Sequence, residues 1–289
     1  MNWIQKNRLQ LKELLAAPKI VVAPGCGDVV TARLVELLKL PAIHASGSVA
    51  HRTSGYADAG ILTMNEMVNR VSALADGVDL PIIADADTGF GGLANVVRTV
   101  KEYEWAGASA IHIEDQLTPK RPIHGGYSGG FISLNEMVGK IKAALDTRLD
   151  NNFIVIARCD IDDWNQKQER VMACIEAGAD GAWLSVRDTN KMEILSKASG
   201  KPMFGVLPRS MNLDQYQSAG ASCAVIPGAL QLAALCNQRL LLESLKSRGS
   251  CAEFLSEIDH IDEMREFYNN QGFEDLRLAE KYYGAKQTT

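Results

Sequence analysis

The 289-residue sequence lacks several features that would each point to a particular class of protein. No apolar run approaches the roughly 20 residues that a membrane-spanning helix needs. No stripe of lysines and arginines appears, and the net charge of −5 argues against nucleic acid or an anionic membrane as a partner. Residues 1–20 are charged and have helical spacing, unlike a signal peptide. We therefore expect a cytoplasmic protein.

The cysteines show no pair with the spacing of a zinc site or a redox motif. No CxxC motif occurs among Cys26, Cys159, Cys174, Cys223, Cys236 and Cys251. Such scattered positions indicate reduced thiols rather than a disulfide framework. The simplest interpretation of each cysteine is a small apolar side chain in the core.

The sequence also lacks a Gly-, Ser- or Pro-rich linker that would separate two domains. Hydrophobic residues make up 46% and charged residues 22%, as in a globular protein with a large core. We predict a single domain over residues 1–289, in which residues 229–289 form a C-terminal helical extension. This extension either packs on its own domain or docks on another subunit.

Short apolar runs alternate with longer amphipathic segments along the chain. We expect eight strands, at 19–25, 42–46, 81–87, 110–115, 153–160, 181–186, 202–208 and 223–228. Most of them lack polar–apolar alternation, which is typical of parallel strands buried on both faces. Eight alternating units predict an α/β fold, the (β/α)8 TIM barrel, with a doubly wound sheet as the alternative.

Polar residues follow the predicted strands at their C-terminal ends, where active sites of such barrels lie. The motif DADTGFGG places Asp85 and Asp87 at the end of the third strand, and Glu114 and Arg158 lie at the ends of the next two. Buried carboxylates are costly unless a cation compensates them, so this cluster favours an Mg²⁺ or Mn²⁺ site. Arg158 is suited to bind a substrate carboxylate in a bidentate manner. The alternatives are helix capping by the acids and a structural salt bridge for Arg158.

The motifs SGS, DADTGFGG, IEDQ, PKRPIHGG and IARCD occur in an order that resembles the isocitrate lyase/phosphoenolpyruvate mutase superfamily. The similarity covers roughly residues 15–230, and its best match is the branch of 2-methylisocitrate-lyase-like enzymes. The resemblance implies a (β/α)8 barrel, Mg²⁺, a homotetramer (or a homodimer), and C-terminal helices exchanged between subunits. It also implies a small carboxylate substrate that reacts through an enolate-like intermediate.

The same resemblance assigns roles to individual residues of this chain. The implied metal ligands are Asp85, Asp87 and Glu114. The implied substrate contacts are Ser46, Gly47, Asp85 and Arg158. The implied catalytic residues are Asp58, an acid near the metal, Lys120 and His124 of an active-site loop, and Arg158.

The chain departs from the family's lyases within that loop. Those enzymes typically read Lys-Arg-Cys-Gly-His, whereas this chain has Pro122 and Ile123 in place of the cysteine and the glycine. Proline has no titratable group, so the usual proton donor is missing. A glutamate that the lyases carry after the sixth strand is also absent, with Ser185 at or near its place. We expect an intact metal site with an altered protonation step.

Several other side chains are candidates to replace the missing thiol as the proton donor. His124 titrates near neutrality and lies in the loop. Cys26 follows the first strand and is expected to face the barrel mouth or to pack in the core. Cys159 is expected to be structural, and His44 and His112 are expected in the core or at an interface.

These observations predict an enzyme, an Mg²⁺-dependent carbon–carbon lyase acting on a small 2-oxo or 2-hydroxy di- or tricarboxylate. A divalent ion that chelates a 2-oxo acid stabilises the developing enolate as a Lewis acid, for retro-aldol cleavage or decarboxylation. General-acid assistance is typically worth about 10²–10⁴-fold, so the lost thiol leaves metal catalysis possible. Two alternatives stay open: a phosphonopyruvate-type enzyme that breaks or moves a C–P bond, and a non-catalytic carboxylate-binding paralogue, which the retained acids disfavour.

Overall fold

The computed structural model describes residues 2–121, 129–184 and 189–284. The chain divides into two compact units, Met1–Gln231 and Leu232–Thr289. The single domain expected over 1–289 stays a prediction. No helix among the described residues is long and apolar enough to cross a membrane.

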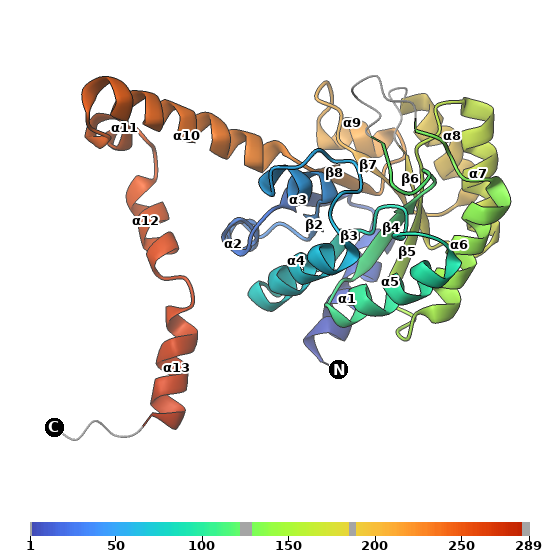
Figure 1. Ribbon diagram of the computed structural model, residues 1–289, viewed down its shortest axis with the longest axis horizontal. Helices are drawn as coiled ribbons and strands as arrows, with labels where there is room; N and C mark the ends of the chain where they lie inside the picture. The colour runs from blue at the N-terminus through green and yellow to red at the C-terminus, as the bar shows by residue number, and fades with distance from the viewer. Residues whose placement is uncertain (1, 122–128, 185–188, 285–289) are drawn as a thin grey trace. The chain divides into compact units, whose positions relative to one another are not determined.

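The first unit is a closed barrel of parallel strands, in which the last strand pairs with the first (Figure 1). The strands are β1 (Val21–Cys26), β2 (Ile43–Ala45), β3 (Ile82–Asp85), β4 (Ala110–Glu114), β5 (Ile154–Cys159), β6 (Gly181–Leu184), β7 (Met203–Val206) and β8 (Cys223–Ile226). The predicted (β/α)8 TIM barrel is confirmed. Most strands end one or two residues before the predicted end.

Helices follow the strands and surround the barrel, and the N-terminal helix precedes β1 (Figure 1). They are α1 (Trp3–Ala16), α2 (Val29–Leu37), α3 (Gly47–Thr53), α4 (Met64–Gly77), α5 (Leu93–Trp105), α6 (Leu134–Thr147), α7 (Trp164–Glu176), α8 (Thr189–Ser199) and α9 (Leu213–Ser218). Local sequence sets where many of them begin. The side chains of Thr63, Ser133 and Asp163, for example, each accept a hydrogen bond from the first turn of the helix that follows.

Both faces of the barrel strands are buried, and both carry apolar side chains. Ile83, Ile156 and Phe204 belong to one core cluster, whereas Ile82 and Val155, their neighbours in sequence, belong to another. Alternate residues of a strand point to opposite faces, so one cluster fills the barrel and the other lies under the helices. This arrangement explains why the strands read as continuous apolar runs.

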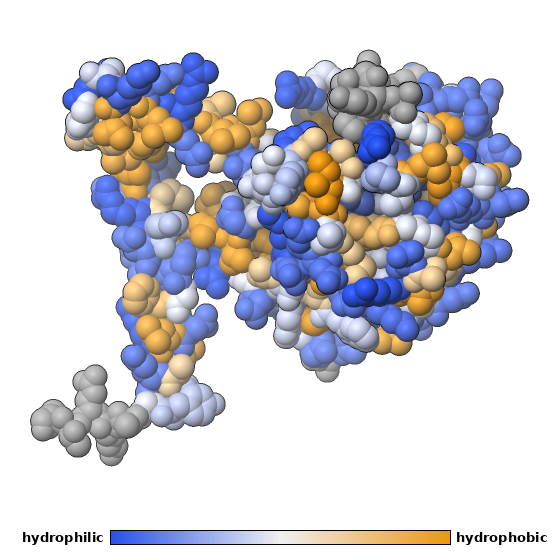
Figure 2. Space-filling view, in the orientation of Figure 1, coloured by the Kyte–Doolittle hydropathy of each residue, from blue (hydrophilic) through white to orange (hydrophobic). Residues whose placement is uncertain are grey.

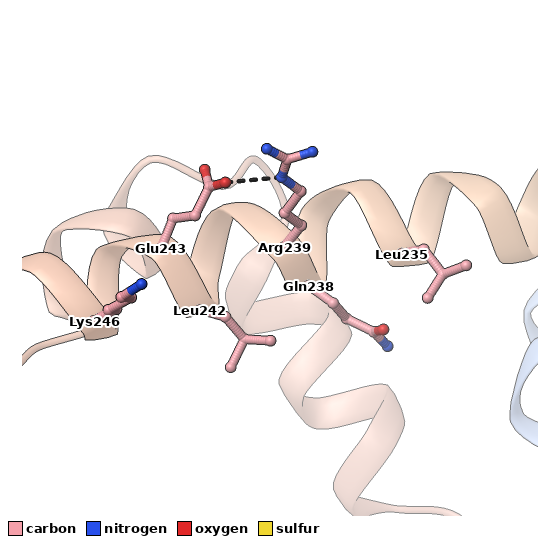
Figure 3. Close-up of a pocket in the computed structure, with 6 residues that line it drawn as sticks. All are labelled: Leu235, Gln238, Arg239, Leu242, Glu243 and Lys246. Carbon is pink, nitrogen blue, oxygen red and sulfur yellow. Dashed lines mark hydrogen bonds and ion pairs between the residues drawn. The ribbon is translucent and has the colours of Figure 1, made fainter.

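The predicted C-terminal helices are present, as α10 (Ala229–Arg248), α11 (Ala252–Ser256), α12 (Ile261–Asn269) and α13 (Phe273–Tyr283). None of them has a buried residue, and large apolar side chains lie exposed along them (Figure 2). On α10 a shallow hollow runs between Leu235 and Leu242, and an ion pair of 2.8 Å joins Arg239 Nε to Glu243 Oε1 beside it (Figure 3). The exchange of these helices between subunits stays a prediction.

Candidate active site

The predicted metal ligands lie at the ends of two paired strands. Asp85 is the last residue of β3 and pairs in register with His112 of β4, while Glu114 ends β4 and pairs with Arg158 of β5. The side chains of Asp85, Asp87 and Glu114 are all buried. Adjacent parallel strands therefore bring these groups to one edge of the barrel, as the sequence predicts.

Asp87 is placed by a turn rather than by strand alternation. β3 ends at Asp85, and Asp87 has a φ of +47°, in the left-handed region that non-glycine residues rarely adopt. Its backbone N–H donates to Asp85 Oδ1 at 3.0 Å, which holds the two aspartates together. On the far side of the turn, the buried Lys140 ammonium donates to Thr88 O at 2.9 Å.

Lys120 lies buried between two of the predicted acids. Its Nζ is 2.8 Å from Asp58 Oδ1 and 2.5 Å from Asp87 Oδ1. Burial alone would lower the pKa of Lys120, but the carboxylates of Glu114 and Asp87 outweigh that effect and raise the pKa well above its usual value. Lys120 is therefore a fixed positive charge inside the cluster, and it brings Asp58 from a separate loop to the site.

Arg158 is held by acids on both sides. Its Nε and Nη2 donate to the two oxygens of Asp160 at 3.1 and 2.7 Å, and Nη1 lies 3.3 Å from Glu114 Oε2. The guanidinium also lies over the Trp183 ring, 5.6 Å from its centroid. A bidentate pair of this kind fixes the plane of the guanidinium and leaves Nη1 as the donor nearest the metal ligands.

Three of the carboxyl groups have oxygens without a hydrogen bond, Asp58 at Oδ1 alone. Both oxygens of Asp87 and both of Glu114 are buried and lack a hydrogen-bond partner of good geometry, although Lys120 and Arg158 lie within ion-pair distance. Burial raises the pKa of Asp87, and it raises the pKa of Glu114 to about 8. Such oxygens are costly to bury, and a hard divalent cation is the partner that suits them.

These acids do not form a ready-made cage. No three His, Cys, Asp or Glu side chains converge around one point in the described part of the chain. Lys120 and Arg158 each lie within ion-pair distance of two carboxyl groups of this cluster. Mg²⁺ commonly uses one or two protein carboxylates together with waters and substrate oxygens, so the donor set fits this ion without such a cage.

Ser46 and Gly47 form the next edge of the site. Ser46 follows β2 and caps α3, and the Gly47 N–H donates to Asp85 Oδ2 at 3.2 Å. A Cβ atom at position 47 would lie 2.5 Å from that same oxygen. Glycine is therefore required here, since any side chain would displace Asp85.

Two histidines lie beneath Asp85, inside the barrel. His44 Nε2 and His112 Nε2 are 3.0 Å apart, and His112 Nδ1 is 3.6 Å from Asp85 Oδ1. Burial lowers the pKa of His44 to about 4 and that of His112 to about 3, so both are neutral at pH 7. The sequence indicated only a core or interface position for these residues, and it missed their contact with the site.

Several predicted residues fall outside the described ranges. They are His124, Pro122, Ile123 and Ser185. Cys26, by contrast, is described: it is buried, its thiol lies 3.7 Å from Pro24 O, and burial raises its pKa to about 12. A thiol held so firmly protonated is a poor substitute for an acid that must give up a proton near neutral pH.

Comparison with known proteins places this site in a family. Residues 11–245 match the family model described as phosphoenolpyruvate phosphomutase. The chain belongs to this family. It is also 33% identical to 2-methylisocitrate lyase of Aeropyrum pernix over 283 residues, which cover 94% of this chain and 89% of that enzyme. The predicted membership of the isocitrate lyase/phosphoenolpyruvate mutase superfamily is confirmed.

A second relative and a solved structure extend the comparison. The chain is 45% identical to 2,3-dimethylmalate lyase of Eubacterium barkeri over 177 residues, which span 59% of this chain and 60% of that enzyme. The crystal structure of phosphonopyruvate hydrolase in complex with oxalate and Mg²⁺ is similar, with a TM-score of 0.84, 28% identity, and coverage of 96% of this chain and 99% of that one. The named lyases support the predicted class, a carbon–carbon lyase, and enzymes of this superfamily use a divalent metal ion.

Proposed function

We propose that this chain is an Mg²⁺-dependent carbon–carbon lyase that cleaves a small 2-oxo or 2-hydroxy di- or tricarboxylate. The observation that supports this proposal most is the pair of buried carboxyl groups, Asp87 and Glu114, whose oxygens lack hydrogen bonds beside two fixed cations. Unpaired buried acids suit a cation, and the cations Lys120 and Arg158 suit an anionic substrate. The 45% identity to a dimethylmalate lyase favours this class of substrate.

In this proposal Asp85, Asp87 and Glu114 hold the metal, directly or through water. A divalent ion bound to the oxygens of a 2-oxo acid acts as a Lewis acid. Mg²⁺ is our first choice because every protein donor is a carboxylate oxygen, and Mn²⁺ is the alternative. The structure of the related phosphonopyruvate hydrolase with oxalate and Mg²⁺ supports the same choice.

Arg158, Ser46 and Gly47 bind the substrate carboxylate in this proposal. Arg158 keeps its two hydrogen bonds to Asp160, and its Nη1 exchanges Glu114 for the substrate carboxylate. The rigid pair with Asp160 means that little side-chain entropy is lost on binding. Ser46 and the backbone near Gly47 add hydrogen bonds where negative charge develops.

Lys120, Asp58 and His124 complete the proposed catalytic set. In decarboxylation of a 2-oxo acid the electron pair stays on the 2-oxo fragment as CO₂ leaves. In retro-aldol cleavage of a 2-hydroxy acid the hydroxyl loses its proton and becomes the carbonyl of the 2-oxo product, and the electron pair goes to the other fragment. In either case the fragment that keeps the electron pair must take up one proton. The charged Lys120 stabilises that fragment electrostatically, and Asp58 holds Lys120 in place at 2.8 Å. We assign the proton to His124, because the family's cysteine is replaced by Pro122.

We also propose a homo-oligomer, a tetramer or a dimer, in which the C-terminal helices pack against another subunit. Residues such as Leu235, Leu242, Phe273 and Leu276 are about half exposed, which is costly for apolar side chains. Light scattering during size-exclusion chromatography tests this proposal, and a monomer of 31.4 kDa contradicts it.

A substrate panel tests the chemistry directly. The protein is incubated with Mg²⁺ and, separately, with oxaloacetate, isocitrate, 2-methylisocitrate, 2,3-dimethylmalate and phosphonopyruvate, and products are followed by NMR. We expect carbon–carbon cleavage of at least one carboxylate, and its loss in Asp85→Ala. Turnover of phosphonopyruvate alone would replace the proposal with C–P chemistry. No turnover, together with tight binding of oxalate, would indicate a non-catalytic paralogue.

A further inference from the structure

His51 is fully buried, and both of its ring nitrogens have a partner. Nδ1 lies 2.8 Å from Gly47 O, and Nε2 lies 3.2 Å from Leu62 N. A backbone N–H can only donate, so Nε2 must be unprotonated to accept from Leu62. The proton is therefore on Nδ1, which donates to the Gly47 carbonyl. The two hydrogen bonds thus assign the Nδ1–H tautomer.

The two partners of His51 belong to two different parts of the proposed site. Gly47 follows the substrate contact Ser46, and its N–H binds Asp85. Leu62 lies near the end of the loop of residues 54–63 (the Asp58 loop), which carries Asp58 and through it the ion pair with Lys120. The His51 ring is thus a bridge between the end of β2 and the Asp58 loop.

The Asp58 loop has few other hydrogen bonds to hold it. It contains no helix or strand, and the backbone bonds that begin in it are short-range, such as Ala59 N–H to Ala57 O at 2.9 Å. Leu62 is buried, so without the imidazole its N–H would lose its acceptor, and an unsatisfied buried donor is destabilising. The loop would relieve that cost by moving, and Asp58 would move with it.

We propose that His51 is a positioning residue that, as the Nδ1–H tautomer, fixes Asp58 and Lys120 relative to Ser46 and Gly47. This inference rests on the function proposed for those four residues. His51 itself touches neither substrate nor metal in this scheme. Its effect is transmitted through the Gly47 carbonyl and the Leu62 amide, and its Nδ1 also lies 3.7 Å from Asp58 Oδ1.

Three variants separate the two hydrogen bonds. His51→Asn places an amide nitrogen near the position of Nδ1 and keeps only the bond to Gly47. His51→Gln places an amide oxygen near the position of Nε2 and keeps the bond to Leu62, whereas His51→Leu removes both. Because the Leu62 bond holds the Asp58 loop, we expect kcat to fall about 10–100-fold in His51→Leu and to recover mostly in His51→Gln but not in His51→Asn.

Gln217→Leu is the matched control for a purely structural loss. The Gln217 amide bridges Ile20 N, at 3.1 Å, and Pro18 O, in the segment before β1 at the opposite end of the barrel. We expect this variant to lower Tm. Its kcat and KM should stay within about twofold of wild type, because Gln217 lies far from the site. If His51→Leu also lowers only Tm, His51 is structural and the proposal is wrong.

Two further measurements do not depend on turnover. NMR of protein with ¹⁵N-labelled histidine rings reports which ring nitrogen carries the proton, and the signals of His51 are those that disappear in His51→Gln. They must show a protonated Nδ1 and an unprotonated Nε2. The opposite pattern overturns the proposal. Calorimetry with Mg²⁺ and oxalate must show weaker oxalate binding in His51→Leu than in Gln217→Leu, and equal affinity also overturns it. A wild-type protein that turns over no member of the panel refutes the proposed function, while these two measurements still decide the role of His51.

Discussion

Replacing Glu114 by glutamine tests whether the buried acid is kept for a cation. Glu114 is fully buried, and burial raises its pKa from 4.5 to about 8. At a pH between 4.5 and 8, Glu114 has lost its proton in the unfolded chain but still holds it in the folded protein. The unfolded state therefore binds fewer protons, and the free energy of unfolding falls as the pH rises. Glutamine has nearly the same shape but does not titrate, so this part of the pH dependence disappears.

The size of the effect follows from the width of that window. Each pKa unit corresponds to about 1.4 kcal/mol, so the metal-free wild type should lose about 3 kcal/mol between pH 5.5 and 8 through Glu114. For a chain of 289 residues that is a fall in Tm of roughly 5 °C. Asp115, whose pKa burial raises to about 6, contributes equally to wild type and Glu114→Gln, so the difference between the two isolates Glu114.

The assay is thermal unfolding with EDTA and with Mg²⁺ at both pH values. With EDTA, Glu114→Gln should lose less Tm between pH 5.5 and 8 than wild type does. With Mg²⁺ at 100 times its Kd, wild type should gain about 2.7 kcal/mol at pH 8, and the variant clearly less. Equal pH slopes in the two proteins would refute the buried-acid reasoning. An equal gain from Mg²⁺ would remove Glu114 from the metal site.

Three other substitutions test separate contacts. Gly47→Ala places a Cβ 2.5 Å from Asp85 Oδ2 and should lower kcat/KM at least about tenfold in steady-state kinetics; an unchanged value would show that Asp85 need not stay in place. Arg158→Lys loses the bidentate pair with Asp160 and should raise KM about tenfold or more with a smaller change in kcat, which a titration of initial rates measures. Asp85→Ala should abolish activation by Mg²⁺, and activation that survives would reject Asp85 as a metal ligand.

Much of this site could be predicted because its residues follow strands. Apolar runs and helix caps are local signals that show where strands and helices lie. Eight alternating units predict a closed barrel, in which all parallel strands end at the same edge. Asp85, Glu114 and Arg158 fall at those ends, so their proximity follows from the fold.

The contacts that were missed depend on irregular backbone. Asp87 stands in a left-handed turn just beyond β3, where strand periodicity no longer applies. Lys120 reaches Asp58 across 62 positions of sequence, between two segments without regular structure. His51 lies on α3, but its acceptor role is set by an amide in the loop that follows. No periodic pattern reports such pairings, because each depends on the path of a particular loop.

The electrostatics of the mouth connect these observations. Its carboxyl groups outnumber its cations, since Lys120 and Arg158 share it with Asp58, Asp85, Asp87, Glu114 and Asp160. A dianionic substrate entering alone would add to this excess, and a divalent ion entering alone would compete with Lys120 and Arg158 for the same oxygens. When both bind, the charges of ion and substrate cancel, and Arg158 can exchange Glu114 for the substrate while Asp160 holds its other edge. The same ion pairs thus favour joint binding of metal and carboxylate over binding of either one.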